Sequence, residues 1–399
     1  MGKMENIIGQ LYSRDSKRPI PYNYRKKLIA KSRNCSYITE RCIEVPNTYN
    51  KIFASVWVNN DHVVVGTKCN RLLEINVQNG TKREIPLMRS PYPREIPEPA
   101  AGIHAIALNP SKSFMATGGH NVNDLALYSL PDYQPYAVGE FHHNWLFGIS
   151  WINDFMLCTG ARDGNICLWT IFDVEGFSTY EESCGIHRKT PIEILKTEGI
   201  VRIRDTHYNP VCERLGTVGY GVGKYDAKVC LVDVRQPLQK RVMDLPQKEE
   251  NIVISGHDTS PVFAVGSLSH LMLIDDRDPN TTDITSVKVL EPAQGIRSLS
   301  FQGDVITIGA CKTSLMFYDV RNRKYVNDHN DNPVKRCLKQ GYVAENWDWH
   351  THRYSFFPQL TSEIISIMTH CYDDSGLRLF AAGGPLPLDL IGNYASIWE

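Results

Sequence analysis

A short apolar run that ends in glycine recurs seven times between residue 51 and the end of the chain. The separations between successive glycines are 52, 42, 59, 47, 43 and 74 residues. A period of about 40–45 residues is that of a four-stranded propeller blade, and loop insertions account for longer separations. Seven copies in one order therefore predict a ring of seven small sheets. The seven glycines are Gly66, Gly118, Gly160, Gly219, Gly266, Gly309 and Gly383.

Each glycine run lies between two further β-like runs, as the strand order of a blade requires. Examples are FASVWV, GIHAIAL and GIRSLSF before the glycine run, and LLEINV, ICLWTI and YASIW after it. Weaker fourth strands such as TKREIPL follow. The sequence stops just after a third strand, so we expect residues 41–45 to supply the last outer strand and to close the ring. The predicted fold is an all-β, seven-bladed WD-repeat β-propeller over residues 39–399.

Residues 1–38 are interpreted as a separate N-terminal basic extension. Its first 33 residues contain nine Lys or Arg, against only Glu5 and Asp15. The spacing of Ile7, Leu11 and Tyr12 indicates one short amphipathic helix. A solvated basic tail is an equally good interpretation of the part after Pro19.

Composition and charge exclude several classes of protein. The 43 Lys and Arg balance 44 Asp and Glu, which argues against a general nucleic-acid or anionic-membrane binder. Apolar runs are too short for a transmembrane helix, and the N-terminus has no secretory signal. The 11 cysteines show no metal-ligand spacing, which predicts free thiols inside the cell. We expect a cytoplasmic protein, with the nucleus as a second location, and no metal or cofactor.

Catalytic signatures are absent from the sequence, so we predict a protein that is not an enzyme. Gly219–Tyr225 fails as a phosphate-binding loop because Tyr225 stands where Ser or Thr should bind magnesium. Residues 172–199 and 322–362 are interpreted as long loops between blades. The latter contains His350-Thr351-His352, for which aromatic packing of the loop is favoured over a metal site.

An apolar-Asp-x-Arg element ends the third strand in three consecutive blades. Its arginines are Arg235, Arg277 and Arg321. The connections between third and fourth strands all emerge at one face of a propeller, so these arginines predict a docking edge for a partner. The aspartates are expected to form hydrogen bonds within their own blades.

Five basic residues are expected at the opposite face, where the connections into the first strands lie. First strands line the central channel, so these side chains can converge and form an anion site. Charge-assisted hydrogen bonds contribute roughly 1.5–3 kcal/mol each, and micromolar binding needs about 8 kcal/mol. Two or three clustered carboxylates would suffice, as would a phosphopeptide or an inositol phosphate. The five residues are Lys68, Arg162, Arg202, Arg204 and Arg297.

The sequence resembles the damage-specific DNA-binding protein 1 and cullin-4-associated factor 12 family over roughly residues 37–399. The resemblance is densest in KIFAS at 51–55, VGTKCN at 65–70, GIHAI at 102–106, GIRS at 295–298, and the C-terminal THCYD, LFAAGGPLP and GNYASIW. It implies a substrate receptor of cullin-4 RING ubiquitin ligases that binds acidic C-termini ending in two glutamates. The same five basic residues fall on the family's pocket, with Arg202 where a lysine is usual.

The resemblance also implies how such a receptor would meet its ligase. Ile7, Leu11 and Tyr12 fall where the family's N-terminal segment docks on the ligase adaptor, damage-specific DNA-binding protein 1. We therefore expect a non-catalytic receptor whose Asp-x-Arg face binds that adaptor and whose basic face binds substrates. The alternative is a propeller scaffold for phosphopeptides or inositol phosphates, unconnected with ubiquitin.

Overall fold

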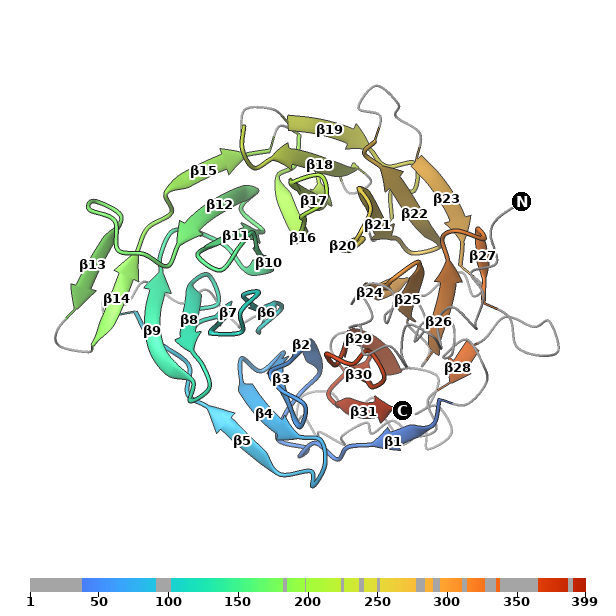
Figure 1. The fold of residues 1–399 in the computed structure, drawn as a ribbon, viewed down its shortest axis with the longest axis horizontal. Helices are drawn as coiled ribbons and strands as arrows, with labels where there is room; N and C mark the ends of the chain where they lie inside the picture. The colour runs from blue at the N-terminus through green and yellow to red at the C-terminus, as the bar shows by residue number, and fades with distance from the viewer. Residues whose placement is uncertain are drawn as a thin grey trace, which may run out of the picture.

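The strands form a ring of seven sheets around a central channel (Figure 1). The computed structural model describes residues 38–90, 102–181, 185–197, 199–223, 226–236, 240–249, 252–277, 284–289, 295–310, 314–326, 335–337, 365–386 and 390–399. The predicted all-β, seven-bladed propeller is confirmed. The N-terminal helix predicted around Ile7, Leu11 and Tyr12 lies outside the described residues, as do residues 327–334 and 338–362 of the predicted second long loop.

Each blade is a sheet of antiparallel strands, and its strands follow one another from the channel to the rim. In blades one to three these are β2 Ile52–Trp57, β3 His62–Thr67, β4 Leu72–Asn76 and β5 Lys82–Ile85; β6 Ile106–Leu108, β7 Phe114–Gly118, β8 Leu125–Ser129 and β9 Gln134–Gly139; and β10 Leu146–Trp151, β11 Met156–Ala161, β12 Asn165–Thr170 and β15 Glu193–Lys196.

Blades four to seven repeat this order. Their strands are β16 Arg202–Asn209, β17 Arg214–Tyr220, β18 Ala227–Asp233 and β19 Lys240–Asp244; β20 Val253–Gly256, β21 Val262–Gly266, β22 His270–Asp275 and β23 Ile284–Lys288; β24 Ile296–Gln302, β25 Val305–Ala310, β26 Ser314–Asp319 and β27 Lys324–Tyr325, with β28 Lys335–Cys337 also paired to β26; and β29 Ile365–Tyr372, β30 Leu379–Pro385, β31 Tyr394–Trp398 and β1 Glu40–Cys42.

Strand β1 closes the ring. It pairs antiparallel with β31, with Arg41 opposite Ile397, and the N–H of Thr39 donates to the carbonyl of Glu399 at 2.8 Å. The outer strand of blade seven therefore comes from the N-terminal part of the chain, as predicted, but it spans Glu40–Cys42 and not residues 41–45. Pairing the two ends of the chain removes the exposed edge that β31 would otherwise present.

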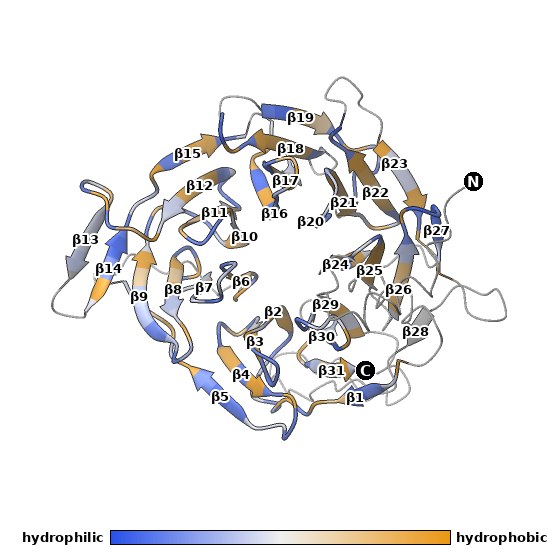
Figure 2. Ribbon diagram, viewed as in Figure 1, coloured by the Kyte–Doolittle hydropathy of each residue, from blue (hydrophilic) through white to orange (hydrophobic). Residues whose placement is uncertain are grey.

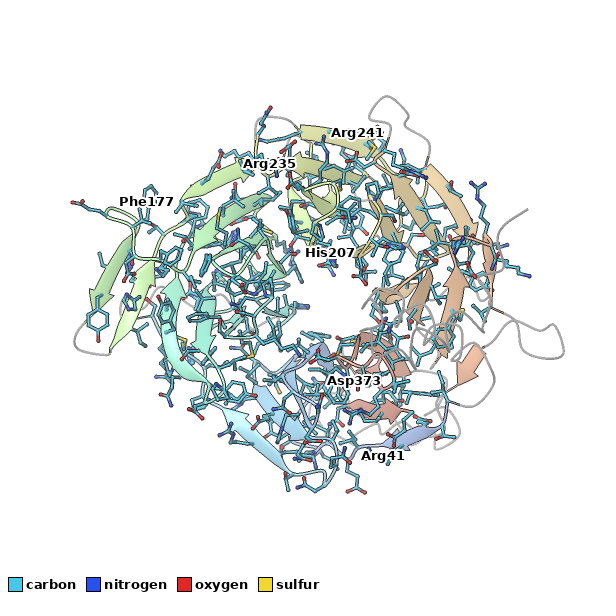
Figure 3. All side chains as sticks on the ribbon, viewed as in Figure 1. Arg41, Phe177, His207, Arg235, Arg241 and Asp373 are labelled. Carbon is cyan, nitrogen blue, oxygen red and sulfur yellow. The ribbon has the colours of Figure 1, made fainter. Side chains whose placement is uncertain are left out.

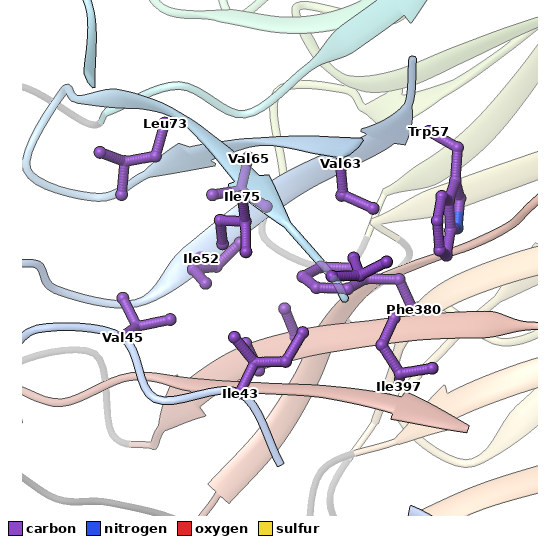
Figure 4. Packing of buried hydrophobic residues seen from close by; sticks show 13 residues of the cluster. Ile43, Val45, Ile52, Trp57, Val63, Val65, Leu73, Ile75, Phe380 and Ile397 are labelled. Atoms are coloured by element: carbon purple, nitrogen blue, oxygen red, sulfur yellow. The ribbon is translucent and has the colours of Figure 1, made fainter. Parts of the chain in front are cut away.

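The hydrophobic core lies between neighbouring blades. At the junction of blades seven and one, Ile43, Ile52 and Val65 pack against Phe380 and Ile397, and all five are buried (Figure 4). Burying one such side chain contributes roughly 1.5–3 kcal/mol. Hydropathy falls toward the rim, where outer strands such as β5 and β19 are largely hydrophilic (Figure 2).

Residues 172–199 are not simply a loop between blades three and four. They contain the hairpin β13 Ser178–Glu181 and β14 Ile186–Lys189, followed by β15, the outer strand of blade three. Strand β14 pairs parallel with β9, so the hairpin enlarges the sheet of blade two to six strands. The prediction of a loop was wrong. Strand β14 is held by hydrogen bonds to β9 of blade two, and such pairing with a distant strand produces no periodic pattern in the sequence.

Seven cysteines of the described residues are free thiols: Cys42, Cys69, Cys158, Cys167, Cys212, Cys230 and Cys371. Cys158, Cys167 and Cys230 are buried, whereas Cys42 and Cys69 are exposed. In the same residues, no helix has the length and apolar character needed to cross a membrane.

Candidate functional site: an arginine pocket in the channel

The inner strands of five blades share an irregularity at the same place. Their register against the second strand shifts by one residue, as in a β-bulge, between Ile52/Ala54, Leu146/Gly148, Ile203/Asp205, Ile296/Ser298 and Ile367/Thr369. A bulge redirects the extra side chain and is common beside functional sites. The extra residues, here called the bulge residues, are Phe53, Phe147, Arg204, Arg297 and Met368.

All five bulge residues line one cavity of about 330 Å³ in the channel. His104 lines it as well, from the residues just before β6. Arg204 and Arg297 are the two arginines in the wall. They belong to blades four and six, so the closed ring brings together side chains that are far apart in sequence.

Two of the recurring glycines, Gly160 and Gly266, make room for the strands that carry the bulge arginines. A Cβ on Gly160 would lie 2.8 Å from Cγ2 of Ile203, and one on Gly266 would lie 2.6 Å from Cγ2 of Ile296. Each isoleucine is fully buried and directly precedes a bulge arginine. At these two positions the glycine of one blade therefore makes the space that seats the inner strand of the next. This close approach explains why Gly160 and Gly266 carry no side chain.

An aromatic row supports Arg204. Its guanidinium lies 4.3 Å from the ring centroid of Phe147. Phe147 meets His104 edge to face at 4.5 Å, and His104 stacks on Phe53 at 4.5 Å. Stacking engages the face of a guanidinium, while its N–H donors point outward in the plane, where they match a carboxylate. Bulge residues of blades one and three, with His104 of blade two, thus orient the arginine of blade four.

The other three predicted basic residues are placed differently. The Arg162 guanidinium lies 4.7 Å from the ring centroid of Trp145, whose ring centroid lies 6.3 Å from that of Phe147, so Arg162 is connected to the aromatic row through Trp145. Lys68 is half-buried in the turn after β3, and Arg202 is exposed at the start of β16. Within the described residues, none of these three lines the cavity. The structure therefore brings two of the five predicted residues into one cavity and connects a third to it.

Asp205 and His207 follow Arg204 along β16 and also line the cavity. Figure 3 places His207 beside the channel. Burial raises the pKa of Asp205 to about 7, although its carboxylate accepts hydrogen bonds from the N–H groups of Ile254 and Thr206 and lies near the Arg204 charge. Burial lowers the pKa of His207 to about 4. At neutral pH, His207 is therefore uncharged, whereas Asp205 is partly ionised.

His370 bridges two inner strands beside Arg297. Its Nδ1 and Nε2 atoms each lie 2.7 Å from a hydroxyl, those of Ser298 and Ser300 respectively. Burial lowers the pKa of His370 to about 3. Such a ring is a weak base at neutral pH. This Ser–His pairing therefore connects β24 to β29 and does not resemble an activated nucleophile.

The Asp-x-Arg arginines lie on the opposite face of the ring, here called the bottom face, where third strands lead toward fourth strands. Their side chains are exposed by 71–75%. Arg235 pairs with Glu213, Arg277 with Asp275, and Arg321 with Asp304. Of the aspartates, Asp233 and Asp275 each accept a hydrogen bond from the N–H of the arginine two residues later. The expected hydrogen bonding within the blade thus takes the form of a local turn.

Blade three contains a polar network that the sequence analysis missed. His142 lies before the inner strand; its Nε2 is 2.8 Å from the Thr159 hydroxyl, which also accepts from Nε1 of Trp169 at 2.8 Å. Nδ1 of His142 lies 3.1 Å from Asp163. Burial alone would raise the pKa of Asp163, but the His142 hydrogen bond and charge lower it to about 2. The sequence does contain a signal for this network: Gly139 and His142 precede the inner strand, and Trp169 lies in the third strand.

A histidine before the inner strand and a tryptophan on the third strand mark a WD-repeat blade. Together with the ring of seven sheets, this network defines the class as a WD-repeat β-propeller. A sequence model described as the DDB1- and CUL4-associated factor 12 beta propeller matches residues 36–399. The chain belongs to this family.

Two solved structures are similar to the whole ring. The crystal structure of RRP9 WD40 repeats is 12% identical, covering 91% of this chain and 99% of that chain, with a TM-score of 0.63. The structure of U3-55K is 13% identical, covering 90% of this chain and 98% of that chain, with a TM-score of 0.62. At such low identity, these similarities support the fold alone.

Proposed function

We propose that this protein is a substrate receptor of a cullin-4 RING ubiquitin ligase, and that its channel captures protein C-termini ending in two glutamates. The observation that carries the proposal is the pair of bulge arginines, Arg204 and Arg297, in the wall of one cavity. Arg162 adds positive charge beside it through the aromatic row. An anionic ligand of small cross-section fits this arrangement.

The strength of the interactions favours a ligand with several carboxylates. A charge-assisted hydrogen bond contributes roughly 1.5–3 kcal/mol, and micromolar binding requires about 8 kcal/mol. A single carboxylate is therefore insufficient. A terminal carboxylate with two glutamate side chains supplies three anions, and two of these can pair with Arg204 and Arg297 in a planar, bidentate manner.

The part of the proposal that concerns the ligase rests on the family to which the chain belongs. Association with DDB1 and CUL4 is what the family's name states, and we infer the same association here. The exposed arginines Arg235, Arg277 and Arg321 on the bottom face, with Ile7, Leu11 and Tyr12 of the N-terminal extension, would dock on DDB1. Substrates would occupy the opposite face. This chain would then bring about ubiquitin transfer by proximity and would perform no chemistry itself.

A peptide ending in Glu-Glu should bind the purified protein, and the same peptide with an amidated C-terminus should bind at least tenfold more weakly. Amidation removes one of the three anions and nothing else. Fluorescence anisotropy with a labelled peptide measures both affinities. Equal binding of the two peptides would contradict the proposal, and tight binding of inositol hexakisphosphate alone would favour the scaffold alternative.

Affinity for that peptide should fall about fivefold between pH 6 and pH 8. The pKa of Asp205 is about 7, so raising the pH through this value adds a negative charge beside Arg204 and weakens its attraction for a carboxylate. His207 and His370 have pKa values of about 4 and 3, so neither changes charge in this window. The glutamates of the peptide are ionised throughout it.

Asp205→Asn is the matched control for this pH dependence. The asparagine keeps the side-chain shape and cannot ionise, so affinity at pH 8 should rise to near the wild-type value at pH 6. A variant with the full wild-type pH dependence would refute the role of Asp205.

A further inference from the structure

One pair of side chains on the bottom face differs in chemistry from its equivalents in the neighbouring blades. In each of blades one to six, the N–H of the residue that follows the third strand donates to the carbonyl of the residue that precedes the second strand. In blade three these are Ile171 and Phe155, at 2.9 Å. This hydrogen bond makes the acceptor residue and the residue after the donor an equivalent pair of positions in every blade. The six pairs are Asp61 with Gln78, Ser113 with Pro131, Phe155 with Phe172, Glu213 with Arg235, Pro261 with Arg277, and Asp304 with Arg321.

Blade three has an aromatic pair where two other blades have an ion pair. In blades four and six, the two positions hold the Glu213–Arg235 and Asp304–Arg321 ion pairs. In blade three, Phe155 and Phe172 stack with ring centroids 4.8 Å apart and are exposed by 48% and 55%. Of the six pairs, this is the one in which both residues are large and apolar. An exposed aromatic pair at a position suited to charged residues indicates a function other than stability.

The aromatic pair is held in place from within the protein. The side-chain oxygen of Asn153 accepts hydrogen bonds from the N–H groups of Phe155 and Met156, at 2.8 and 2.9 Å. Lys189 is buried, and its Nζ donates to the carbonyl of Phe172 at 3.0 Å. The two rings therefore form a preformed surface, here called the aromatic platform. A preformed surface loses little conformational entropy when a partner binds.

The arginines of the bottom face are poorly suited to supply most of the affinity for a partner. Arg235, Arg277 and Arg321 are strongly exposed, and each already pairs with a carboxylate of this chain. Exposed ion pairs contribute little binding energy, although they orient a partner and speed its association. Most of the energy of an interface comes from a few well-packed residues, and aromatic side chains are prominent among them.

We propose that the aromatic platform is the main anchoring contact for DDB1. This partner assignment rests on the proposed function, which places DDB1 on the bottom face. Blades three and four are neighbours in the ring, so the platform extends the row of arginines that begins with Arg235 (Figure 1). DDB1 covers the two rings with an apolar recess, and its carboxylates meet the arginines of blades four to six.

The equivalent pair in blade four supplies the variant that tests this contact. Phe155→Glu combined with Phe172→Arg reproduces the Glu213–Arg235 pair at positions with the same backbone hydrogen bond, so the blade should fold. The double variant should bind purified DDB1 at least tenfold more weakly than wild type, measured by surface plasmon resonance on the full-length protein. Arg235→Ala should weaken binding no more than about threefold.

Two controls show that the loss is local. The midpoint of urea unfolding of the double variant should stay close to that of wild type. Val222→Arg adds an arginine at an exposed apolar residue in the turn between β17 and β18, which lies on the opposite face, and should leave DDB1 affinity unchanged.

The outcomes separate this proposal from the proposed function. A folded double variant with wild-type affinity for DDB1 would overturn the role of the platform and leave the ligase proposal intact. A wild-type protein that does not bind DDB1 would overturn both. Light scattering that shows a wild-type dimer, dissociated by the double variant, would assign the platform to a second copy of the chain.

Discussion

Replacing Arg204 by glutamate should abolish binding of peptides that end in two glutamates, with affinity reduced at least about a hundredfold. The change removes a charge-assisted interaction of roughly 1.5–3 kcal/mol and adds repulsion in the same cavity. Arg297→Glu should have an effect of similar size, because both side chains line that cavity. Fluorescence anisotropy with the labelled peptide measures each loss.

Arg235→Glu is the matched control, since it is the same substitution at an exposed arginine on the bottom face. It should leave peptide affinity within about twofold of wild type. Conversely, Arg204→Glu should still co-purify with DDB1, which shows that the variant is folded and that the two surfaces are separate. Unchanged peptide binding by Arg204→Glu would refute the pocket assignment.

Replacing Asp276 by alanine should lower the free energy of unfolding by roughly 3 kcal/mol. Its buried carboxylate accepts from Arg214 of blade four at 2.8 Å and lies 3.3 Å from Arg241 of the same blade. Burial raises the pKa of Asp276 despite these two positive neighbours. Removing the carboxylate would leave the mostly buried side chains of Arg214 and Arg241, 23% and 18% exposed, without the anion that they share. Equilibrium urea unfolding measures the change.

The adjacent residue provides an internal comparison. Asp275 has a similar partner in Arg277, but both side chains are substantially exposed, by 39% and 74%. Asp275→Ala should therefore cost less than about 1 kcal/mol. Asp276→Asn, which preserves the shape, should fall between the two alanine variants. Equal losses for the two alanine variants would refute the role of the inter-blade ion pair.

The amino-acid sequence determined the ring and its closure. The glycine runs are predictive because several of them reflect a steric requirement: a Cβ on Gly66, Gly160, Gly266 or Gly309 would come within 2.8 Å of an isoleucine of the next blade. An outer strand from the N-terminal part could be predicted because β31 would otherwise present an exposed edge, although the strand is Glu40–Cys42 and not residues 41–45. Such local requirements are written into short stretches of sequence, and repetition makes them visible.

Only the tertiary structure decided which basic residues share a cavity. Arg202 and Arg204 are two residues apart, yet Arg204 sits at a bulge and lines the channel while Arg202 is exposed. A bulge is a shift in register between paired strands, so no single strand reveals it. The aromatic row from Phe53 to Phe147 and the attachment of β14 to blade two likewise depend on contacts between blades. These are long-range contacts, and the closed ring fixes their geometry.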